Sequence, residues 1–328
     1  MDFQQITPYS SSAWNSERYS NQKPRPEQGT LTKWLQGGDP LPWSRPNTSL
    51  PASMIQEPTP TEIKQRLKNN KGETHWDEKK YGAGSLNKWG LIYFYLTMFG
   101  KGICTIFAPI FSIVVLCFII FDDNLDFNEL ADVIFIYIAY IFLPSGLIWG
   151  YAEASEHGYL PMPWFMKAVK YFTFSRSTGM VTRYKNNKEL YSHPFPEFDC
   201  YLVSSPSHQG ILSYQLHLVH RYHRYFDSIP LHGFSTSQQP DEFKRVWNLI
   251  QRYMDTSQPM PDVPELEPAR PRDPTTAAWD KQHNRKPDYW FSMDDDEFEE
   301  AIAQLRAEQR FMPSQGPEID LFNGGTQV

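Results

Sequence analysis

Histidine is concentrated in one short stretch of this sequence, HLVHRYHRY, which contains His217, His220 and His223. A spacing of three residues would place the three imidazoles along one side of a helix, where they could bind a metal ion. In a strand, His217 and His223 would point to one face and His220 to the other, which separates the potential ligands. The stretch contains no cysteine or carboxylate, and its alternation favours a strand. We therefore expect no metal site here.

Two arginines adjoin these histidines. Arg221 and Arg224 could contact anionic lipid headgroups, because the predicted domain follows closely after an apolar run. We name them as candidate membrane-surface residues.

The chain lacks the common short signatures of catalysis. It contains no GxGxxG, phosphate-binding loop, HExxH, GxSxG or CxxC pattern. Its three cysteines, Cys104, Cys117 and Cys200, are too scattered for a disulfide framework or for metal-ligand spacing. Glu153 and His157 share a helical face, but a hydrated helix end explains this pair better than a metal or proton site. The sequence predicts no catalytic residue, no cofactor and no metal ligand.

Two uncharged apolar runs predict a pair of membrane-spanning helices, over about residues 102–121 and 133–151. At a rise of 1.5 Å per residue, about 20 residues cross the ~30 Å core of a bilayer. Two such runs so close together are less consistent with the buried helices of a soluble core. The apolar stretch 89–101 ends at Lys101 and could either lengthen the first span or lie in the interface. The first run begins too late for a signal peptide.

The charge distribution predicts an orientation for this helical hairpin. The connecting stretch DDNLDFNELAD, residues 122–132, is acidic and has no lysine or arginine. Basic residues lie outside the pair, including Lys80 and Lys88 before it and Lys167 and Lys170 after it. Because basic residues favour the cytoplasmic side, we expect both termini in the cytoplasm. The net charge of −7, without a strongly basic segment, argues against binding to nucleic acid.

Residues 165–257 predict a cytoplasmic β-rich module. Alternation in FTFSRSTGMVTRY indicates a hairpin with strands that start near Phe172 and Met180. Gly179 can supply the positive φ that the tight turn between them needs. Arg183, Tyr191 and Phe195 are the candidate residues for binding a protein partner on exposed edges or loops, since tyrosine and arginine are favoured at interface hot spots.

Further strands and one helix complete this predicted module. Strands are expected over 198–204, 211–220 and 225–231, although 211–226 also fits a helical period. The apolar spacing in EFKRVWNLIQRYM, after Asp241, predicts an amphipathic helix. Strands in series closed by one helix are typical of a small α+β module, and a pleckstrin-homology-like roll is the architecture that we expect.

The N-terminal part of the chain is expected to be loosely structured. Residues 1–60 are polar and rich in Pro, Ser, Gln and Asn, so they should bury too little apolar surface to fold and form a disordered arm. Trp14, Trp34 and Trp43 either dock onto a partner or the module, or are loosely packed surface aromatics. Residues 61–88 predict a short helical segment beside the membrane.

The C-terminal part, residues 258–328, is Pro-rich and acidic. It is expected to be a disordered tail with a terminal helix over DDDEFEEAIAQLRAEQRF, residues 294–311. Its narrow apolar stripe is sufficient to dock on a surface but not to form a core.

Three motifs together give the chain a resemblance to a known family. Two predicted spans are followed by F-x-F-x-R-x-x-G-x-V, from Phe172 to Val181, and by W-x-x-I-x-R-Y-M, from Trp247 to Met254. Over roughly residues 90–260 the chain resembles an uncharacterised bacterial family of two-span membrane proteins, often encoded beside type VI secretion effectors. The resemblance implies the inner membrane of a Gram-negative bacterium and is compatible with an immunity or an accessory role. It implies no catalytic residue.

These features lead us to expect a non-catalytic inner-membrane protein whose helical hairpin anchors a protein-interaction module. Its partners would be the lipid bilayer and another protein, such as a secreted effector or a secretion component. Two alternatives stay open: a toxin that inserts its hairpin into a rival's membrane, and a membrane enzyme with an unrecognised site.

Overall fold

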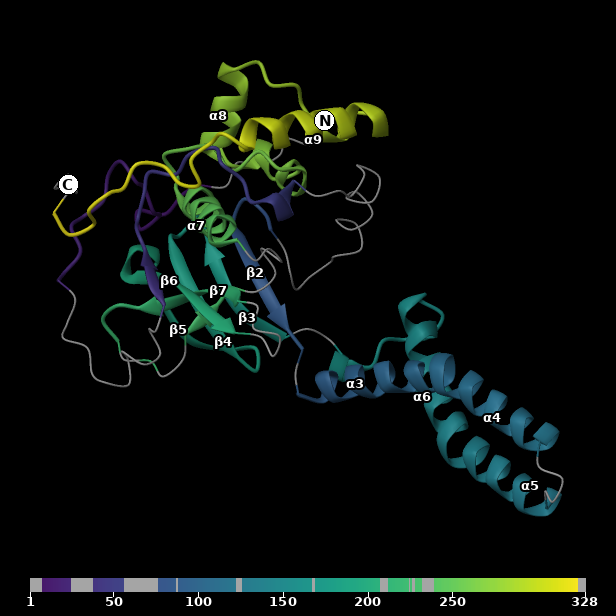
Figure 1. Ribbon diagram of the computed structural model, residues 1–328. Coiled ribbons are helices and arrows are strands. Elements are labelled where there is room, and N and C mark those ends of the chain that lie inside the picture. Colours follow the sequence, from purple (N-terminus) through teal and green to yellow (C-terminus); the bar gives the residue numbers. More distant parts are fainter. Residues whose placement is uncertain are drawn as a thin grey trace. The chain divides into compact units, whose positions relative to one another are not determined.

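The computed structural model describes residues 8–24, 38–55, 76–86, 88–121, 126–166, 169–206, 212–223, 225, 228–231 and 239–323. The chain divides into two compact units, with boundaries between Ala83 and Gly84 and between Val169 and Lys170 (Figure 1). The first unit contains the sheets and the second contains the apolar helices. The helical unit is therefore an insertion in the chain of the sheet-containing unit.

Two four-stranded sheets are described in the first unit. One has the strand order β2-β3-β4-β5, with bounds Lys80–Ser85, Val169–Ser175, Met180–Lys185 and Lys188–Pro194. The other has the order β1-β6-β7-β8, with bounds Asp39–Leu41, Phe198–Pro206, Leu212–His220 and Ile229–Pro230. The predicted α+β character is confirmed, and the strands expected over 198–204 and 211–220 are β6 and β7.

The predicted β-hairpin is formed by β3 and β4. These strands are antiparallel, and Phe174 lies opposite Val181. Both side chains are buried, at 1% and 0% exposure. Gly179 has a φ of +69°, as the turn requires. A Cβ added there would lie 2.4 Å from the carbonyl oxygen of Ser12, so the turn also packs tightly against the N-terminal segment.

The predicted amphipathic helix is α7, Pro240–Met254, which contacts β6 and β7 (Figure 1). Its apolar side is buried, as expected, with Trp247 at 0% exposure. Its polar side is also buried: Asn248 and Gln251 are 0% and 1% exposed. Their amides bond to the backbone of residues 44–49, which cover this side of the helix.

The N-terminal segment is part of the core. Trp14 and Trp43 are 4% and 6% exposed, and the Trp43 ring lies 5.2 Å from that of Trp247. Asp39–Leu41 adds strand β1 to the edge of β6, and Ala52–Met54 forms a short 3-10 turn, η1. The prediction of disorder for residues 1–60 is therefore wrong for 8–24 and 38–55, because the few large apolar side chains bury enough surface to order this polar segment. Trp34 lies outside the described residues.

The segment before the first apolar helix is a strand where it is described. Residues 61–75 lie outside the described residues, whereas Lys80–Ser85 forms β2 beside β3. The expectation of a helix is wrong for this strand, in which Tyr81 and Ala83 alternate toward the core. The Tyr81 ring lies 6.3 Å from that of Phe174 and is stacked on it.

The C-terminal segment also belongs to this core. Phe298 and Ile302, on the predicted terminal helix, are 3% and 4% exposed. This helix is α9, Asp295–Gln309, and it begins with a capping box between Asp294 and Glu297. The expectation of a separate tail from residue 258 is wrong for the described residues. The other helical elements here are η6 Pro264–Leu266, η7 Arg270–Arg272, α8 Pro274–Gln282 and η8 Tyr289–Phe291.

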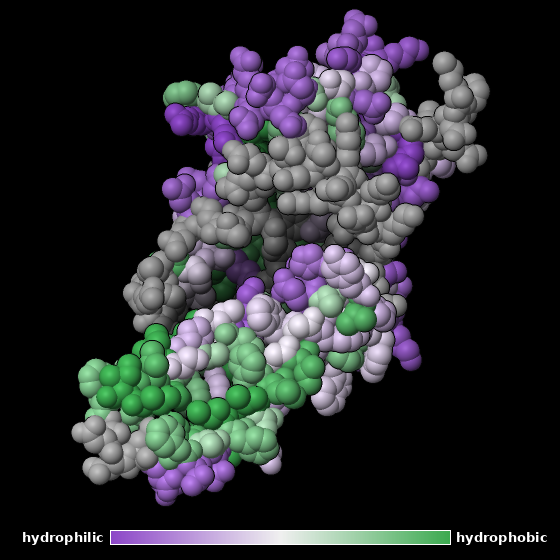
Figure 2. Space-filling model, turned by 90° about the vertical axis from the view of Figure 1, so that its right-hand side faces the viewer, coloured by the Kyte–Doolittle hydropathy of each residue, from purple (hydrophilic) through white to green (hydrophobic). Residues whose placement is uncertain are grey.

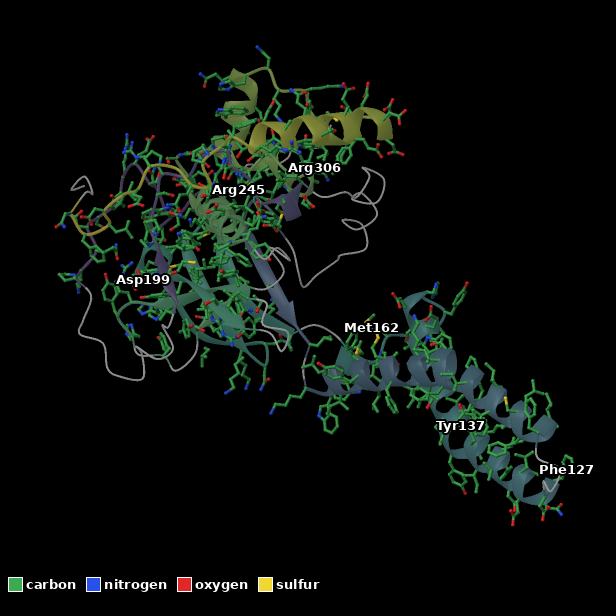
Figure 3. The ribbon with its side chains drawn as sticks, in the orientation of Figure 1. Phe127, Tyr137, Met162, Asp199, Arg245 and Arg306 are labelled. Atoms are coloured by element: carbon green, nitrogen blue, oxygen red, sulfur yellow. The ribbon has the colours of Figure 1, made fainter. Side chains whose placement is uncertain are left out.

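Arginines connect these helices to the segments that cover them (Figure 3). Arg245 on α7 donates to the backbone oxygens of Gln309 and Met312. Arg306 on α9 donates to the backbone oxygen of Ile55. The segment that ends at Ile55 is thus attached to α9, and the segment around Met312 to α7, by hydrogen bonds.

The second unit is a pair of long apolar helices. The first runs from Lys88 to Phe121 through α3 Lys88–Gly102, a π segment η2 Ile103–Phe107 and α4 Ala108–Phe121. The second runs from Phe127 to Glu156 through α5 Phe127–Ile136, a π segment η3 Tyr137–Phe142 and α6 Leu143–Glu156. Both are long and apolar enough to cross a membrane. Residues 89–101 continue the first helix, so the two helices are longer than the predicted 102–121 and 133–151.

Each π segment ends two residues before a proline. Pro109 and Pro144 are the second residues of α4 and α6. Proline has no N–H and its ring clashes with the carbonyl four residues earlier. A π turn widens the helix at this place, which lets each helix continue past its proline. Short 3-10 turns elsewhere are η4 Trp164–Met166 and η5 Phe195–Glu197.

Candidate functional site

The three residues predicted to bind a protein partner are core residues. Phe195 is 0% exposed, and its ring lies 4.8 Å from that of Trp43. Tyr191 is 7% exposed. Arg183 is 6% exposed and stacks its guanidinium 3.5 Å from the centre of the Tyr171 ring. The prediction that these side chains form an exposed binding surface is therefore wrong, because the N-terminal segment and the sheet cover them.

Arg221 is also buried. Its guanidinium donates to the Asp199 carboxylate at 2.8 Å, and its side chain is fully covered. Burial disfavours the charge, but the hydrogen bond and the charge of Asp199 outweigh it and raise the pKa of Arg221. The expectation that Arg221 contacts lipid headgroups is wrong, because its donors are used inside the protein. Arg224 lies outside the described residues.

The structure groups the predicted histidines differently from the sequence. His220 and His223 lie together with His193, at the end of β5, and one ring nitrogen of each lies within 4.8 Å of the others. His217 is not part of this group: its ring nitrogens lie 2.8 Å from Ser228 Oγ and 2.9 Å from Gln215 Oε1. Strand β7 ends at His220, so the alternation that would separate His220 from His223 no longer applies. The spacing of histidines in the sequence does not predict that His193 belongs to this group.

His220 holds the turn that follows β7. Its Nδ1 accepts hydrogen bonds from the backbone N–H groups of Tyr222 and His223, at 3.2 and 2.9 Å. Its Nε2 lies 3.0 Å from Glu197 Oε2. Because Nδ1 is an acceptor, Nε2 carries the proton and donates to the carboxylate. His220 is therefore a neutral, 5% exposed side chain with both nitrogens in use.

His193 packs against His220 and is partly exposed. Its Nε2 is 2.7 Å from the hydroxyl of Tyr225, and its Nδ1 is 3.8 Å from Glu197 Oε2. Its ring centre lies 4.0 Å from that of His220 and 4.9 Å from that of His223. We call His193, Glu197, His220, His223 and Tyr225 the histidine cluster.

Two histidines of this cluster resist protonation. Burial lowers the pKa of His220 to about 4, and it outweighs the hydrogen bond and charge of Glu197, which raise this pKa. Burial and the charge of His223 also lower the pKa of His193. Both rings are neutral at pH 7, and a neutral imidazole is the form that binds metal ions. Imidazoles and a carboxylate are ligand types that suit Zn²⁺, Ni²⁺ and Cu²⁺.

The cluster does not have the parts of a nucleophilic active site. It contains no serine, threonine or cysteine side chain next to a histidine base. Cys200, the only cysteine outside the apolar helices, is fully buried on β6. Burial raises its pKa well above the usual value, which keeps it in the unreactive thiol form.

The helical unit presents an extensive exposed apolar surface. No residue of α4 is buried, and Ile113 and Phe118 are 60% and 52% exposed. Phe127, at the end of the hairpin where α5 begins, is 69% exposed (Figure 3). Hydrophobic residues gather over this hairpin in the face shown in Figure 2. Exposed apolar patches of this kind mark contact with a membrane or with another protein.

Comparisons with family models, with curated proteins and with solved structures find no match to this chain.

Proposed function

We propose that this chain is a non-catalytic membrane protein that anchors an interaction module at the cytoplasmic face of a bacterial inner membrane. One observation carries the proposal: two helices of 34 and 30 residues leave almost all their apolar side chains unburied. In the most apolar stretch of each helix, only 6% and 0% of the residues are buried. Such surface is costly in water and favourable in a bilayer. Soluble core helices would instead bury these residues.

The insertion point supports the anchoring role. The hairpin leaves the first unit after β2 and returns at β3, and these two strands are neighbours in one sheet. The module is therefore held by two covalent connections from the same sheet. The described residues at the far end of the hairpin include Asp126, Glu129 and Asp132, whereas Lys80 and Lys88 precede it. This distribution of charge favours a periplasmic location for the loop and a cytoplasmic location for both termini.

We propose a pleckstrin-homology-like architecture for the module, with the hairpin inserted between its first two strands. The support is the strand order: β2-β3-β4-β5 in one sheet, then β6-β7-β8 in the other, then the closing helix α7. Strand β1 would be an addition that pairs with β6 from the N-terminal segment.

The partner of the module would be a secreted effector or a component of type VI secretion machinery, in an immunity or accessory role. The support is the resemblance carried by Phe172–Val181 and Trp247–Met254. Because Arg183, Tyr191 and Phe195 are buried, the contact would use other residues of the module.

Reporter fusions test the anchoring. Fusions after residue 88 and at residue 170 are expected to be active only with a cytoplasmic reporter, and a fusion at residue 124 only with a periplasmic one. Full-length protein should remain in the membrane pellet after alkaline carbonate extraction. A periplasmic signal at residue 88 or 170, or release by carbonate, would contradict the proposed topology or insertion.

Co-expression tests the role. If the chain is an immunity protein, it should protect a host cell from the toxin encoded by its neighbouring gene. A matched control is Phe195→Ala, which is expected to unfold the module and abolish protection. Toxicity of the chain expressed alone would favour a membrane-inserting toxin instead.

A further inference from the structure

One side of the histidine cluster is open to solvent. His223 is exposed, and the side chains of His193 and Glu197 are 18% and 27% exposed. We propose that His193, His223 and Glu197 bind a transition-metal ion of the Zn²⁺ class, and that His220 positions Glu197. This site is independent of the proposed anchoring and adds a ligand to the module.

His220 itself is excluded as a ligand by its hydrogen bonds. Its Nδ1 lone pair accepts from two backbone N–H groups. If its Nε2 lone pair also bound the metal, the ring would carry no proton and would have to be an imidazolate anion. Its Nε2–H donates to Glu197 instead, at 3.0 Å, which fixes the carboxylate at the edge of the site.

His193 has the arrangement expected of a histidine ligand. When its Nε2–H donates to the Tyr225 hydroxyl, at 2.7 Å, the lone pair of Nδ1 is directed to the side of Glu197. A hydrogen bond from the second ring nitrogen is the usual companion of metal binding. The distance from Nδ1 to Glu197 Oε2 is 3.8 Å. Two ligand atoms that each lie about 2.1 Å from one tetrahedral zinc ion are about 3.4 Å apart, so a small side-chain shift brings this pair to the required spacing.

His223 completes the set from the exposed side. Its ring lies 4.9 Å from that of His193, and one of its ring nitrogens lies within 4.8 Å of a ring nitrogen of His193. An exposed side chain can rotate by the small amount needed to close this distance. Two imidazoles and one carboxylate leave the fourth tetrahedral position to water or to a partner's side chain. Hard cations such as Mg²⁺ prefer oxygen ligands and would bind more weakly.

The test is a Zn²⁺ titration of the full chain in detergent, purified without a histidine tag, by isothermal calorimetry. Wild type is expected to bind one ion per chain. His193→Ala and His223→Ala should each raise Kd by at least about 10-fold, because even the loss of a residue that only orients a ligand lowers metal affinity by about 10–100-fold. The matched control is His217→Ala, which removes a nearby histidine outside the cluster and should leave Kd within about 2-fold.

A second measurement separates loss of a ligand from loss of fold. Co²⁺ should give visible absorption bands of a tetrahedral N/O site in wild type and in His217→Ala, but not in His223→Ala, while near-ultraviolet circular dichroism stays the same in all three. Glu197→Gln should weaken binding with the fold intact. Unchanged Zn²⁺ affinity in the His193→Ala/His223→Ala double variant, or no saturable binding by wild type, would overturn the proposal.

Discussion

Helices α4 and α7 show how differently the two units use apolar residues. In α4 no residue is buried, although the helix has no charged side chain. In α7 every residue from Val246 to Met254 is buried, although several of them are polar or charged. Composition therefore does not decide burial in this chain. The polar residues of α7 are covered because Asn248 and Gln251 form hydrogen bonds with the backbone of the N-terminal segment, whereas most side chains of α4 are exposed among the described residues.

Two deletions should give the largest difference between the units. When residues 86–168 are replaced by a short Gly/Ser linker, the remaining chain is expected to be soluble and folded, because β2 and β3 are neighbours in one sheet. When residues 1–55 are removed, the module is expected not to fold, because Trp14, Trp43 and Leu50 leave the core. Near-ultraviolet circular dichroism and cooperative urea unfolding distinguish the two results.

The same reasoning applies to an isolated fragment of residues 165–257. It lacks β1, β2 and the C-terminal residues that pack on α7, so we expect it to be unfolded or aggregated. A cooperative urea transition of this fragment would show that the N-terminal and C-terminal segments are additions to an independently folding core.

Alanine substitution of two phenylalanines, one in each unit, should show the next largest difference in the free energy of unfolding. Phe195 is 0% exposed in the module and Phe118 is 52% exposed in the hairpin. Phe195→Ala is expected to reduce the free energy of unfolding by about 3–5 kcal/mol, since it leaves a cavity in a packed core. Phe118→Ala should change the stability of the module by less than about 0.5 kcal/mol. Urea unfolding in detergent, followed by tryptophan fluorescence, measures both; equal effects would contradict the assignment of Phe195 to the core.

Local patterns predicted several elements, missed others such as β2 and β5, and predicted burial poorly. The β3–β4 hairpin, α7 and α9 were evident because alternation, helical spacing and capping residues act within a few positions. The N-terminal packing was not evident, since Trp14 and Trp43 contact residues more than 150 positions away and no local period connects them. For the same reason the histidine cluster is not predicted by the sequence: strand alternation places His220 and His223 on opposite faces, and His193 comes from another strand.

The contribution of the Arg176–Asp273 ion pair to the free energy of unfolding should depend on pH. Arg176 is fully buried and donates two hydrogen bonds to Asp273. Burial alone would raise the pKa of Asp273, but the charge and hydrogen bonds of Arg176 outweigh it and lower that pKa. Asp273→Asn is expected to cost about 3 kcal/mol at pH 7, because it leaves a buried charge without its partner.

The sign of the pH dependence follows from the lowered pKa. An ionised Asp273 contributes stability above the pKa of an unfolded aspartate, about 3.9, and this contribution is lost as the pH falls through the lower folded value. The difference between wild type and Asp273→Asn should therefore shrink between pH 5 and pH 3. Urea midpoints at several pH values measure it, with Asp241→Asn, an exposed residue, as the control. A difference that stays constant down to pH 3 would contradict this role.

Substitution of two glycines with similar φ angles, one in each unit, should give the smallest difference in stability between the units. Gly179 in the module and Gly158 after α6 have φ values of +69° and +78°. Any side chain at a positive φ costs about 1–2 kcal/mol through contact with its own backbone. At Gly158 nothing lies within 4 Å of an added Cβ, so Gly158→Ala should show this local cost alone. At Gly179 the added Cβ would lie 2.4 Å from the oxygen of Ser12. Gly179→Ala must therefore also displace the N-terminal segment, and its loss of unfolding free energy should exceed the local cost.

Hydrogen exchange distinguishes the local backbone cost from displacement of the N-terminal segment: increased exchange at residues 10–16 is expected in Gly179→Ala and not in Gly158→Ala. If both variants lose the same stability and residues 10–16 stay protected, the N-terminal segment would not depend on this turn.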